Sequence, residues 1–328
     1  MATYGTDALS EPINSFTQQP ALSEPSATVI SERYDIMAGL PESYQLRSFS
    51  SLSNLKQLQN AVKDIYDQLE NNGWQGNQWL LILGMTQAAI EKLRNQPDCL
   101  SPIAFRFQWI GTTGLIKVVP GVAHDFTTSN VDHHINNTLV RMGLPDTALV
   151  WGHTVTSPGT VTTHGKQPDE CFYPPGRQPS NNQLNGWPTL VIETGVSESL
   201  RKLRKDATWW FENSSGDTRI VLLISIKVNT KQILFEKWQL APPNLPTPVT
   251  RQAIQQLRQQ PNLMPPLVQQ PPNAQIAYCH QEVMITPTRI TGGPFVIPFM
   301  AMFNVPPTGT QGDIIINHQA FRDFTRFV

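Results

Sequence analysis

Two acidic residues are of the type, and in the places, that a metal site requires. Asp169 ends the string Lys-Gln-Pro-Asp at residues 166–169, and Glu193 follows the apolar run of residues 188–192. Each borders a segment that we predict to be a strand, and residues 197–211 then change to helical periodicity. A carboxylate at the carboxyl end of a buried strand points into the crevice where open α/β sheets bind ligands. Two carboxylates there would hold a hard divalent cation such as magnesium.

The elements before this site read as scaffold. Residues 1–50 are polar and rich in proline, which predicts a flexible arm. Apolar residues spaced as on one helix face predict an amphipathic helix over residues 52–69, stopped by Asn-Asn-Gly. A short apolar strand over residues 78–83 follows, and then a helix over residues 86–93 that begins at the cap residue Thr86.

The middle of the chain holds the elements that must position the two acids. After a strand at residues 115–119, periodicity and turn residues predict one helix, three strands, a second helix and a last strand. In chain order these cover residues 126–142, 149–156, 160–164, 189–193, 197–211 and 219–227. The second of the three strands leads into Asp169 and the third ends at Glu193.

Composition changes after residue 240. Residues 241–275 are dominated by proline and glutamine, which predicts an extended linker interrupted by a short helix over residues 251–258. Apolar segments at residues 282–285, 295–303 and 313–316 are typical of strands or packed turns. We expect them to form a cap on the core.

Charge and cysteine content limit the classes of function. The chain has 328 residues and a net charge of -1, so any phosphate binding must come from a local basic patch. Its three cysteines are odd in number and too widely spaced for a zinc pattern, which fits a reducing compartment. No secretory signal core and no membrane-length apolar run is present in the sequence. We expect an intracellular protein, in the cytoplasm or the nucleus, without membrane contact.

One stretch carries a family resemblance. Residues 188–199, with Leu203, Asp206 and the pair Trp209-Trp210, resemble fungal restriction-endonuclease-like proteins of the PD-(D/E)XK nuclease superfamily. The resemblance covers residues 115–238 well and the C-terminus more loosely. It implies an α/β fold with a restriction-endonuclease-like core (helix, three strands, helix, strand). Periodicity and composition add an N-terminal helical extension and a proline-rich C-terminal region. Together these predictions divide the chain into an arm at residues 1–50, an extension at 51–114, the nuclease-like core at 115–240, a linker at 241–275 and a cap at 276–328.

The resemblance also implies a set of site residues. Such nucleases place one acid at the start of a strand, a second on the next strand and a lysine two residues later. Asp169 and Glu193 match the two acids, but position 195 is glycine. Lys227 and Lys202 are therefore the candidates for the catalytic lysine. Lys227 is slightly favoured, because parallel strands would bring the end of its strand beside that of Glu193.

The implied activity is hydrolysis of a phosphodiester bond in DNA or RNA. Asp169 and Glu193 would hold Mg²⁺ or Mn²⁺, which activates water and polarises the phosphate. A lysine would orient that water or stabilise charge on the phosphate oxygens. The alternative is a catalytically inactive nuclease-like fold that binds nucleic acid or protein, which the glycine at position 195 and the near-neutral chain favour. The sequence does not indicate an oligomeric state.

Other polar residues near the site have plainer explanations. The basic cluster Arg201, Lys202, Arg204 and Lys205 is a candidate nucleic-acid contact, or equally a solvated helix face. Five histidines, among them His124, lie in this half of the chain. Single histidines more often form structural hydrogen bonds than bind metal, so we assign none of them to the site.

Overall fold

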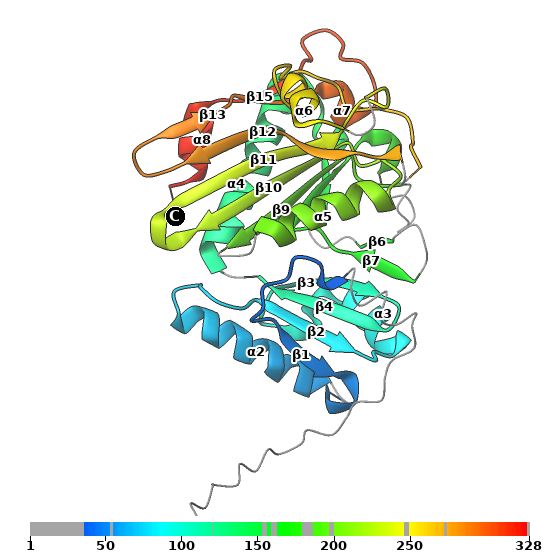
Figure 1. Cartoon of the computed structure of the whole chain (residues 1–328), viewed down its shortest axis with the longest axis vertical. Helices are drawn as coiled ribbons and strands as arrows, with labels where there is room; N and C mark the ends of the chain where they lie inside the picture. The colour runs from blue at the N-terminus through cyan, green and yellow to red at the C-terminus, as the bar shows by residue number, and fades with distance from the viewer. Residues whose placement is uncertain are drawn as a thin grey trace, which may run out of the picture.

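Two large β-sheets and one small one organise the chain, a mixed α/β protein in the computed structural model (Figure 1). The structure describes residues 36–52, 55–119, 121–152, 156–158, 163–178, 186–196, 200–245, 249–271 and 274–326. The six-stranded sheet has the order β1 (Gln45–Ser48), β2 (Trp79–Leu83), β4 (Thr113–Val118), β3 (Phe105–Ile110), β7 (His164–Lys166) and β6 (Ser157–Pro158). The seven-stranded sheet has the order β13 (Ile290–Gly292), β12 (Ala277–Ile285), β11 (Gln232–Leu240), β10 (Ile220–Lys227), β9 (Leu190–Val196), β8 (Glu170–Tyr173) and β5 (Val150–Gly152).

The helix α2 (Leu55–Asn71) covers one face of the six-stranded sheet. Its buried side chains repeat at the spacing of one helix face and pack against β2, β3 and β4: Leu58, Ala61, Val62, Ile65 and Leu69. This confirms the predicted amphipathic helix. The helix α3 (Gln87–Asn95) also begins as predicted, because the Thr86 hydroxyl accepts a hydrogen bond from the amide of Ala89.

The predicted flexible arm is wrong over its last part. Residues 1–35 lie outside the described residues, but β1 pairs in parallel with β2, and Ile36 is buried against the sheet. The strand β1 takes its partners from a segment distant in the sequence, and its own side chains are largely polar. The local composition predicted a flexible arm. Pairing with a segment distant in the sequence instead makes residues 45–48 an edge strand.

The strands β9 and β10 are parallel neighbours joined by α5 (Leu200–Asn213). Figure 1 shows α5 in front of this sheet and α4 (Gly121–Arg141) behind it. Successive residues of β9 alternate between the two helices: Ile192 joins the apolar core with α4, and Val191 joins the core with α5. The carboxyl ends of β9 and β10 lie at the same end of the sheet.

One predicted strand and one predicted domain boundary are corrected. The strand that pairs with β5 and β9 is β8, which begins at Glu170, whereas we predicted a strand at residues 160–164. Residues 159–162 lie outside the described residues, and β7 pairs with β3 in the other sheet. All four residues of β8 are buried, so the alternation that marks a half-buried strand is missing. The predicted domain boundary between the N-terminal extension and the core, at residues 114 and 115, falls inside β4.

Arg219 fastens the proline-rich segment to the sheet. Its buried guanidinium donates hydrogen bonds to the carbonyl oxygens of Gly216, Pro266 and Leu267, at 2.6, 2.8 and 2.6 Å. The helix α6 (Arg251–Arg258) lies in the same region and confirms the predicted short helix. The described part of this segment is therefore docked on the sheet at Arg219.

The C-terminal elements share one apolar core with α4 and the strands β9 to β12. They are β14 (Phe295–Ile297), α7 (Phe299–Phe303), β15 (Ile314–Ile316) and α8 (His318–Phe324). The Phe321 ring centre lies 4.9 Å from that of Phe235 on β11 and 5.4 Å from that of Phe295. Within the described ranges, no helix has the length together with the apolar character of a membrane span.

We predict that Arg219→Met lowers the free energy of unfolding by about 2–4 kcal/mol, because three carbonyl oxygens lose their donor. The measurement is denaturant unfolding, together with limited proteolysis mapped to residues 259–271. The matched control is Arg251→Met on α6, whose side chain is exposed. Equal stability of the two variants would contradict the anchoring role of Arg219.

Candidate active site

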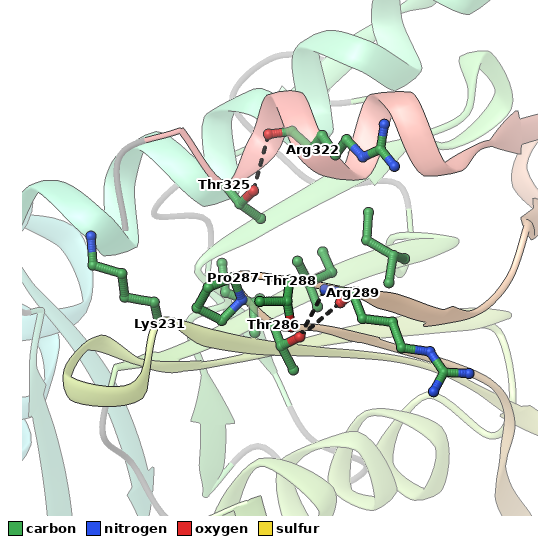
Figure 2. Close-up of a pocket in the computed structure, with 10 residues that line it drawn as sticks. Lys231, Thr286, Pro287, Thr288, Arg289, Arg322 and Thr325 are labelled. Atoms are coloured by element: carbon green, nitrogen blue, oxygen red, sulfur yellow. Dashed lines mark hydrogen bonds between the residues drawn. The ribbon is translucent and has the colours of Figure 1, made fainter.

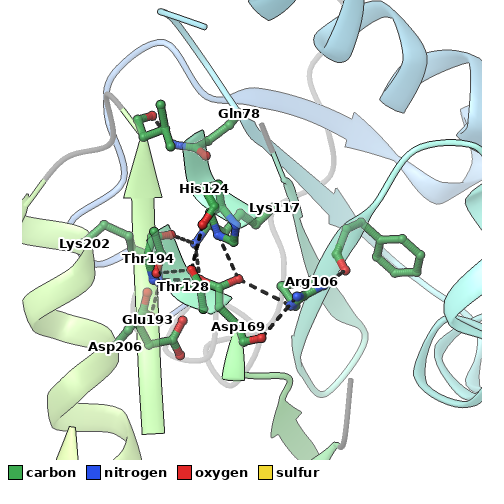
Figure 3. A network of polar contacts seen from close by, with 12 residues as sticks. Gln78, Arg106, Lys117, His124, Thr128, Asp169, Glu193, Thr194, Lys202 and Asp206 are labelled. Carbon is green, nitrogen blue, oxygen red and sulfur yellow. Dashed lines mark hydrogen bonds and ion pairs between the residues drawn. The ribbon is translucent and has the colours of Figure 1, made fainter. Parts of the chain in front are cut away.

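The two predicted acids lie close together where the two large sheets meet. Asp169 immediately precedes β8, and Glu193 lies on the neighbouring strand β9, one register step beyond the pair Glu170–Ile192. The six-stranded sheet contributes Lys117 from β4, beside Asp169 (Figure 3). The site is therefore formed by both sheets, whereas the sequence pointed to one.

The Asp169 carboxylate is surrounded by basic groups. Its Oδ2 atom lies 2.9 Å from the Lys117 ammonium nitrogen and accepts a hydrogen bond from the Thr194 amide at 2.8 Å. Its Oδ1 atom lies 3.3 Å from Arg106 Nε and 3.4 Å from His124 Nε2. Among the described residues, neither of these two contacts has hydrogen-bond geometry, so Oδ1 is a buried oxygen without a donor.

These neighbours determine the protonation state of Asp169. Burial alone would raise the pKa of Asp169, but the charges of Lys117, His124 and Arg106 outweigh it and hold the pKa well below its usual range. Burial alone would lower the pKa of His124, whereas Asp169 and a hydrogen bond to Asp125 raise it above the ordinary histidine value. The site thus favours an ionised carboxylate beside a protonated imidazole.

Glu193 has a different environment, because its side chain contacts the helix α5. Its Oε1 atom accepts a hydrogen bond from the Trp210 indole at 2.7 Å and lies 3.4 Å from the Lys166 ammonium nitrogen. Burial raises the pKa of Glu193, and the nearby charges of Asp169 and Asp206 raise it further against the opposite effect of Lys166. Two acids on neighbouring strands therefore shift in opposite directions.

A second buried ion-pair group extends from Glu193 towards α5. The Lys166 ammonium lies 3.1 Å from Asp206 Oδ1, which also accepts a hydrogen bond from Lys202 one helical turn earlier. Burial alone would raise the pKa of Asp206, but Lys166 and Lys202 hold it below its usual range. The Lys202 ammonium lies 5.1 Å from the centre of the Trp79 ring on β2, a distance at which cation–π attraction operates.

Side-chain hydrogen bonds to carbonyl oxygens of β9 join the six-stranded sheet to the seven-stranded sheet at the site. Lys117 also donates to the carbonyl oxygen of Thr194 at 2.6 Å, and Gln78 donates to that of Val196 at 3.3 Å. Asp169 and Glu193 are consequently only 1% and 2% exposed. A phosphodiester group cannot reach both carboxylates while this contact between the sheets stays closed.

The two candidate catalytic lysines, Lys202 and Lys227, lie in different environments. Lys202 is buried in the ion-pair network, although it contacts Asp206 and not the two predicted metal ligands. Lys227 is exposed at the end of β10. Leu223 is the residue of β10 that pairs with Glu193, so Lys227 lies four residues, roughly 13 Å, farther along the strand. The slight preference for Lys227 as the residue nearest the acids therefore finds no support in the geometry.

The basic cluster on α5 is also divided. Arg201 and Lys205 are exposed, Lys202 is buried, and Arg204 forms an ion pair with the buried carboxylate of Glu236. Of the four cations in the predicted patch, Arg201 and Lys205 are therefore accessible to a ligand without the loss of an ion pair.

Sequence reasoning missed five polar residues that contact or support the two acids: Arg106, Lys117, His124, Lys166 and Asp206. Lys166 stands three residues before Asp169 in the same string, and Asp206 belongs to the segment that carried the resemblance. Lys117 lies in the middle of the apolar run of residues 115–119, and a single lysine in such a run is usually taken for a solvent-facing position. Only the pairing of β4 with β3, and the contact between the sheets, shows its role.

The donor atoms of the site suit a hard divalent cation. Two carboxylates lie near each other, and no donor within the described ranges forms a hydrogen bond with Asp169 Oδ1. The mutual repulsion that helps to raise the pKa of Glu193 would be relieved by a positive ion between the acids. Asp169 and Glu193 would hold such an ion, with the cations Lys117 and Arg106 competing for the same carboxylate.

Another group of ligand atoms lies elsewhere, on β11 and β12. One ligand atom from each of Glu236, Cys279 and Glu282 lies within 4.8 Å of the others. The Glu236 carboxylate is already bound by Arg204 and by the Trp238 indole. This arrangement is explained as an ion pair on the sheet surface.

Comparison with solved structures finds a weak similarity. No family model and no curated protein matches the chain. A crystal structure from Anabaena variabilis, described as a "putative nuclease belonging to DUF820", aligns with 18% sequence identity and a TM-score of 0.34. The alignment covers 52% of this chain and 92% of that chain.

We predict that Asp169→Asn lowers the free energy of unfolding at pH 7 by about 3–5 kcal/mol, because it breaks a buried ion pair. The folded-state pKa of Asp169 lies below its unfolded value, so this contribution is full above about pH 4. It is lost as the pH falls through the folded-state pKa. The difference in stability between wild type and variant should therefore shrink in acid.

The measurement is denaturant unfolding between pH 2.5 and pH 7. Asp67→Asn is the matched control, because the Asp67 carboxylate pairs with Lys63 on the exposed face of α2. That exposed pair should change the stability by less than about 1 kcal/mol. A pH-independent difference between wild type and Asp169→Asn would show that Asp169 has the same pKa in the folded and the unfolded protein, and would contradict its role in the ion pair.

Proposed function

We propose that this protein is a metal-dependent nuclease that hydrolyses phosphodiester bonds of DNA or RNA. The observation that supports this most is one buried network in which Asp169 and Glu193, from neighbouring segments of one sheet, meet the ammonium of Lys166 from the other sheet. Two acids and a lysine are the groups that the PD-(D/E)XK resemblance calls for. Lys166 supplies, from β7, the ammonium that Gly195 cannot supply from β9.

The side chains divide the work of such a reaction. Asp169 and Glu193 would bind Mg²⁺ or Mn²⁺, which supplies charge neutralisation at the phosphate and lowers the pKa of water. Lys166, 3.4 Å from Glu193, would donate hydrogen bonds to the attacking water or to a phosphate oxygen. Asp206 and Lys202 position Lys166 from the α5 side.

Lys117 and His124 would act on Asp169 alone. They keep this carboxylate ionised, which a metal ligand must be. Lys117 also ties the carboxylate to the backbone of Thr194, so the ligand has a fixed direction before any ion binds.

We predict that Asp169→Asn, Glu193→Gln and Lys166→Met each reduce cleavage of labelled single- and double-stranded DNA and RNA at least about 100-fold. Cleavage by the wild type should need Mg²⁺ or Mn²⁺ and stop with EDTA. Lys227→Met is the matched control and should cleave normally, since its side chain lies far along β10. Circular dichroism must show that each variant is folded.

A second candidate function is supported by the burial of both acids. The carboxylates are 2% exposed or less, and basic groups of the protein already neutralise them. A nuclease-like fold that only binds nucleic acid or protein would tolerate that closed arrangement. If the wild type cuts none of these substrates with any metal, and Lys166→Met leaves nucleic-acid binding unchanged, this second function replaces the first.

A further inference from the structure

A basic pocket lies at the end of the seven-stranded sheet, away from the two acids. Its volume is about 300 Å³. The hairpin between β10 and β11, the hairpin between β12 and β13, and the end of α8 surround it (Figure 2). Its polar lining consists of three cations and three hydroxyl side chains: Lys231, Arg289, Arg322, Thr286, Thr288 and Thr325.

The charge of this pocket is one-sided. None of the lining side chains that the structure describes is acidic. Lys231, Arg289 and Arg322 are exposed, and no ion pair of theirs occurs within the described ranges. In a chain with a net charge of -1, three such cations around one hollow form a local positive field.

The frame that carries these cations is well defined. The pocket floor contains the buried side chains of Ile233 and Ile285. In the β12–β13 turn, the Thr286 hydroxyl accepts a hydrogen bond from the Arg289 amide at 3.1 Å, and the Thr286 amide donates to the Arg289 carbonyl at 2.8 Å. Lys231 ends the turn before β11 in the left-handed conformation, with φ of 49°. The backbone positions of the cations are therefore set, while their long side chains can reorient.

The arrangement of the cations favours an extended anion over a compact one. In Figure 2, Lys231 lies on one side of the pocket, and Arg289 and Arg322 lie on the other. The three charged groups do not converge on one point, as they would around a single phosphate ion. A row of phosphates along a polymer can contact them in turn, and each contact releases counterions.

The location connects the pocket with the acids. The strands β9 and β10 are parallel, so the carboxyl end of β9, which follows Glu193, and the β10–β11 turn lie at the same end of the sheet. The exposed Lys227 stands at the start of that turn, between the strand that pairs with β9 and Lys231. The pocket and the carboxyl end of the strand that bears Glu193 thus lie at one end of the sheet.

We propose that this pocket binds the sugar–phosphate backbone of a nucleic acid through Lys231, Arg289 and Arg322. The choice of a nucleic acid as the polyanion rests on the proposed nuclease function. Such contacts hold the backbone without reading its sequence. They would position a strand relative to Asp169 and Glu193 and raise affinity, and they would take no part in the chemical step.

The test compares two triple variants that remove the same charge. Lys231→Gln/Arg289→Gln/Arg322→Gln removes the pocket cations. Lys56→Gln/Lys92→Gln/Arg251→Gln removes three exposed cations from helices α2, α3 and α6. Binding of fluorescent single- and double-stranded DNA and RNA is measured by anisotropy in EDTA, from 50 to 200 mM salt, so that no cleavage occurs.

We predict that the pocket variant weakens binding roughly tenfold or more and reduces the slope of log Kd against log salt by about 2–3, as the loss of three phosphate contacts requires. The control variant should stay within about threefold of the wild type. Equal effects of the two variants would overturn the proposal. So would a pocket variant that binds oligonucleotides normally and loses only binding to vesicles containing phosphatidylserine.

Cleavage by the wild type separates this proposal from the proposed function. Oligonucleotides that bind through the pocket but are never cut would overturn the nuclease and support the pocket. Cleavage by the wild type combined with unchanged affinity of the pocket variant would overturn the pocket alone.

Discussion

The buried ion pair between Lys117 and Asp169 is the interaction on which the site depends. Lys117 belongs to one sheet and Asp169 precedes a strand of the other, so their attraction joins the two sheets. A lone buried charge is too costly to keep, which means that each charged group here needs a partner of opposite sign. The same requirement continues through Glu193 and Lys166 to the helix α5. A structure that buries one carboxylate at this position must therefore build a network around it.

The network gives neighbouring acids different protonation behaviour. Asp169 is next to three basic side chains, whereas Glu193 has one ammonium within reach and two other carboxylates nearby. The pKa values of the two acids move apart for that reason. Divergent pairs of this kind mark sites that handle protons or metal ions, because one member stays ionised while the other resists ionisation. The close contact between the sheets strengthens these effects by excluding water, and it also restricts the approach of any substrate.

The basic side chains of this nearly neutral protein have two separate roles, one in the interior and one at the surface. Inside, Lys117, Lys166 and Lys202 neutralise carboxylates and hold elements together. At the surface, unpaired cations collect near the turns at one end of the seven-stranded sheet. Net charge cannot distinguish these uses, because both contribute equally to the sum. Their difference lies in burial: a lysine without water must pair, and a lysine in water remains available to a partner.

Elements whose signal is local could be predicted from the amino-acid sequence. The spacing of apolar residues predicted α2, the hydroxyl of Thr86 predicted the start of α3, and the apolar run before Glu193 predicted the strand that carries it. The tertiary structure decided which sheet each strand joins, where β1 and β8 lie, and which lysines meet the acids. Lys166 and Lys117 reach the site from another sheet, and Lys227 does not reach it. Periodicity reports the neighbours of a residue within a few positions, but ion pairs across sheets depend on strand order, which no short stretch of sequence contains.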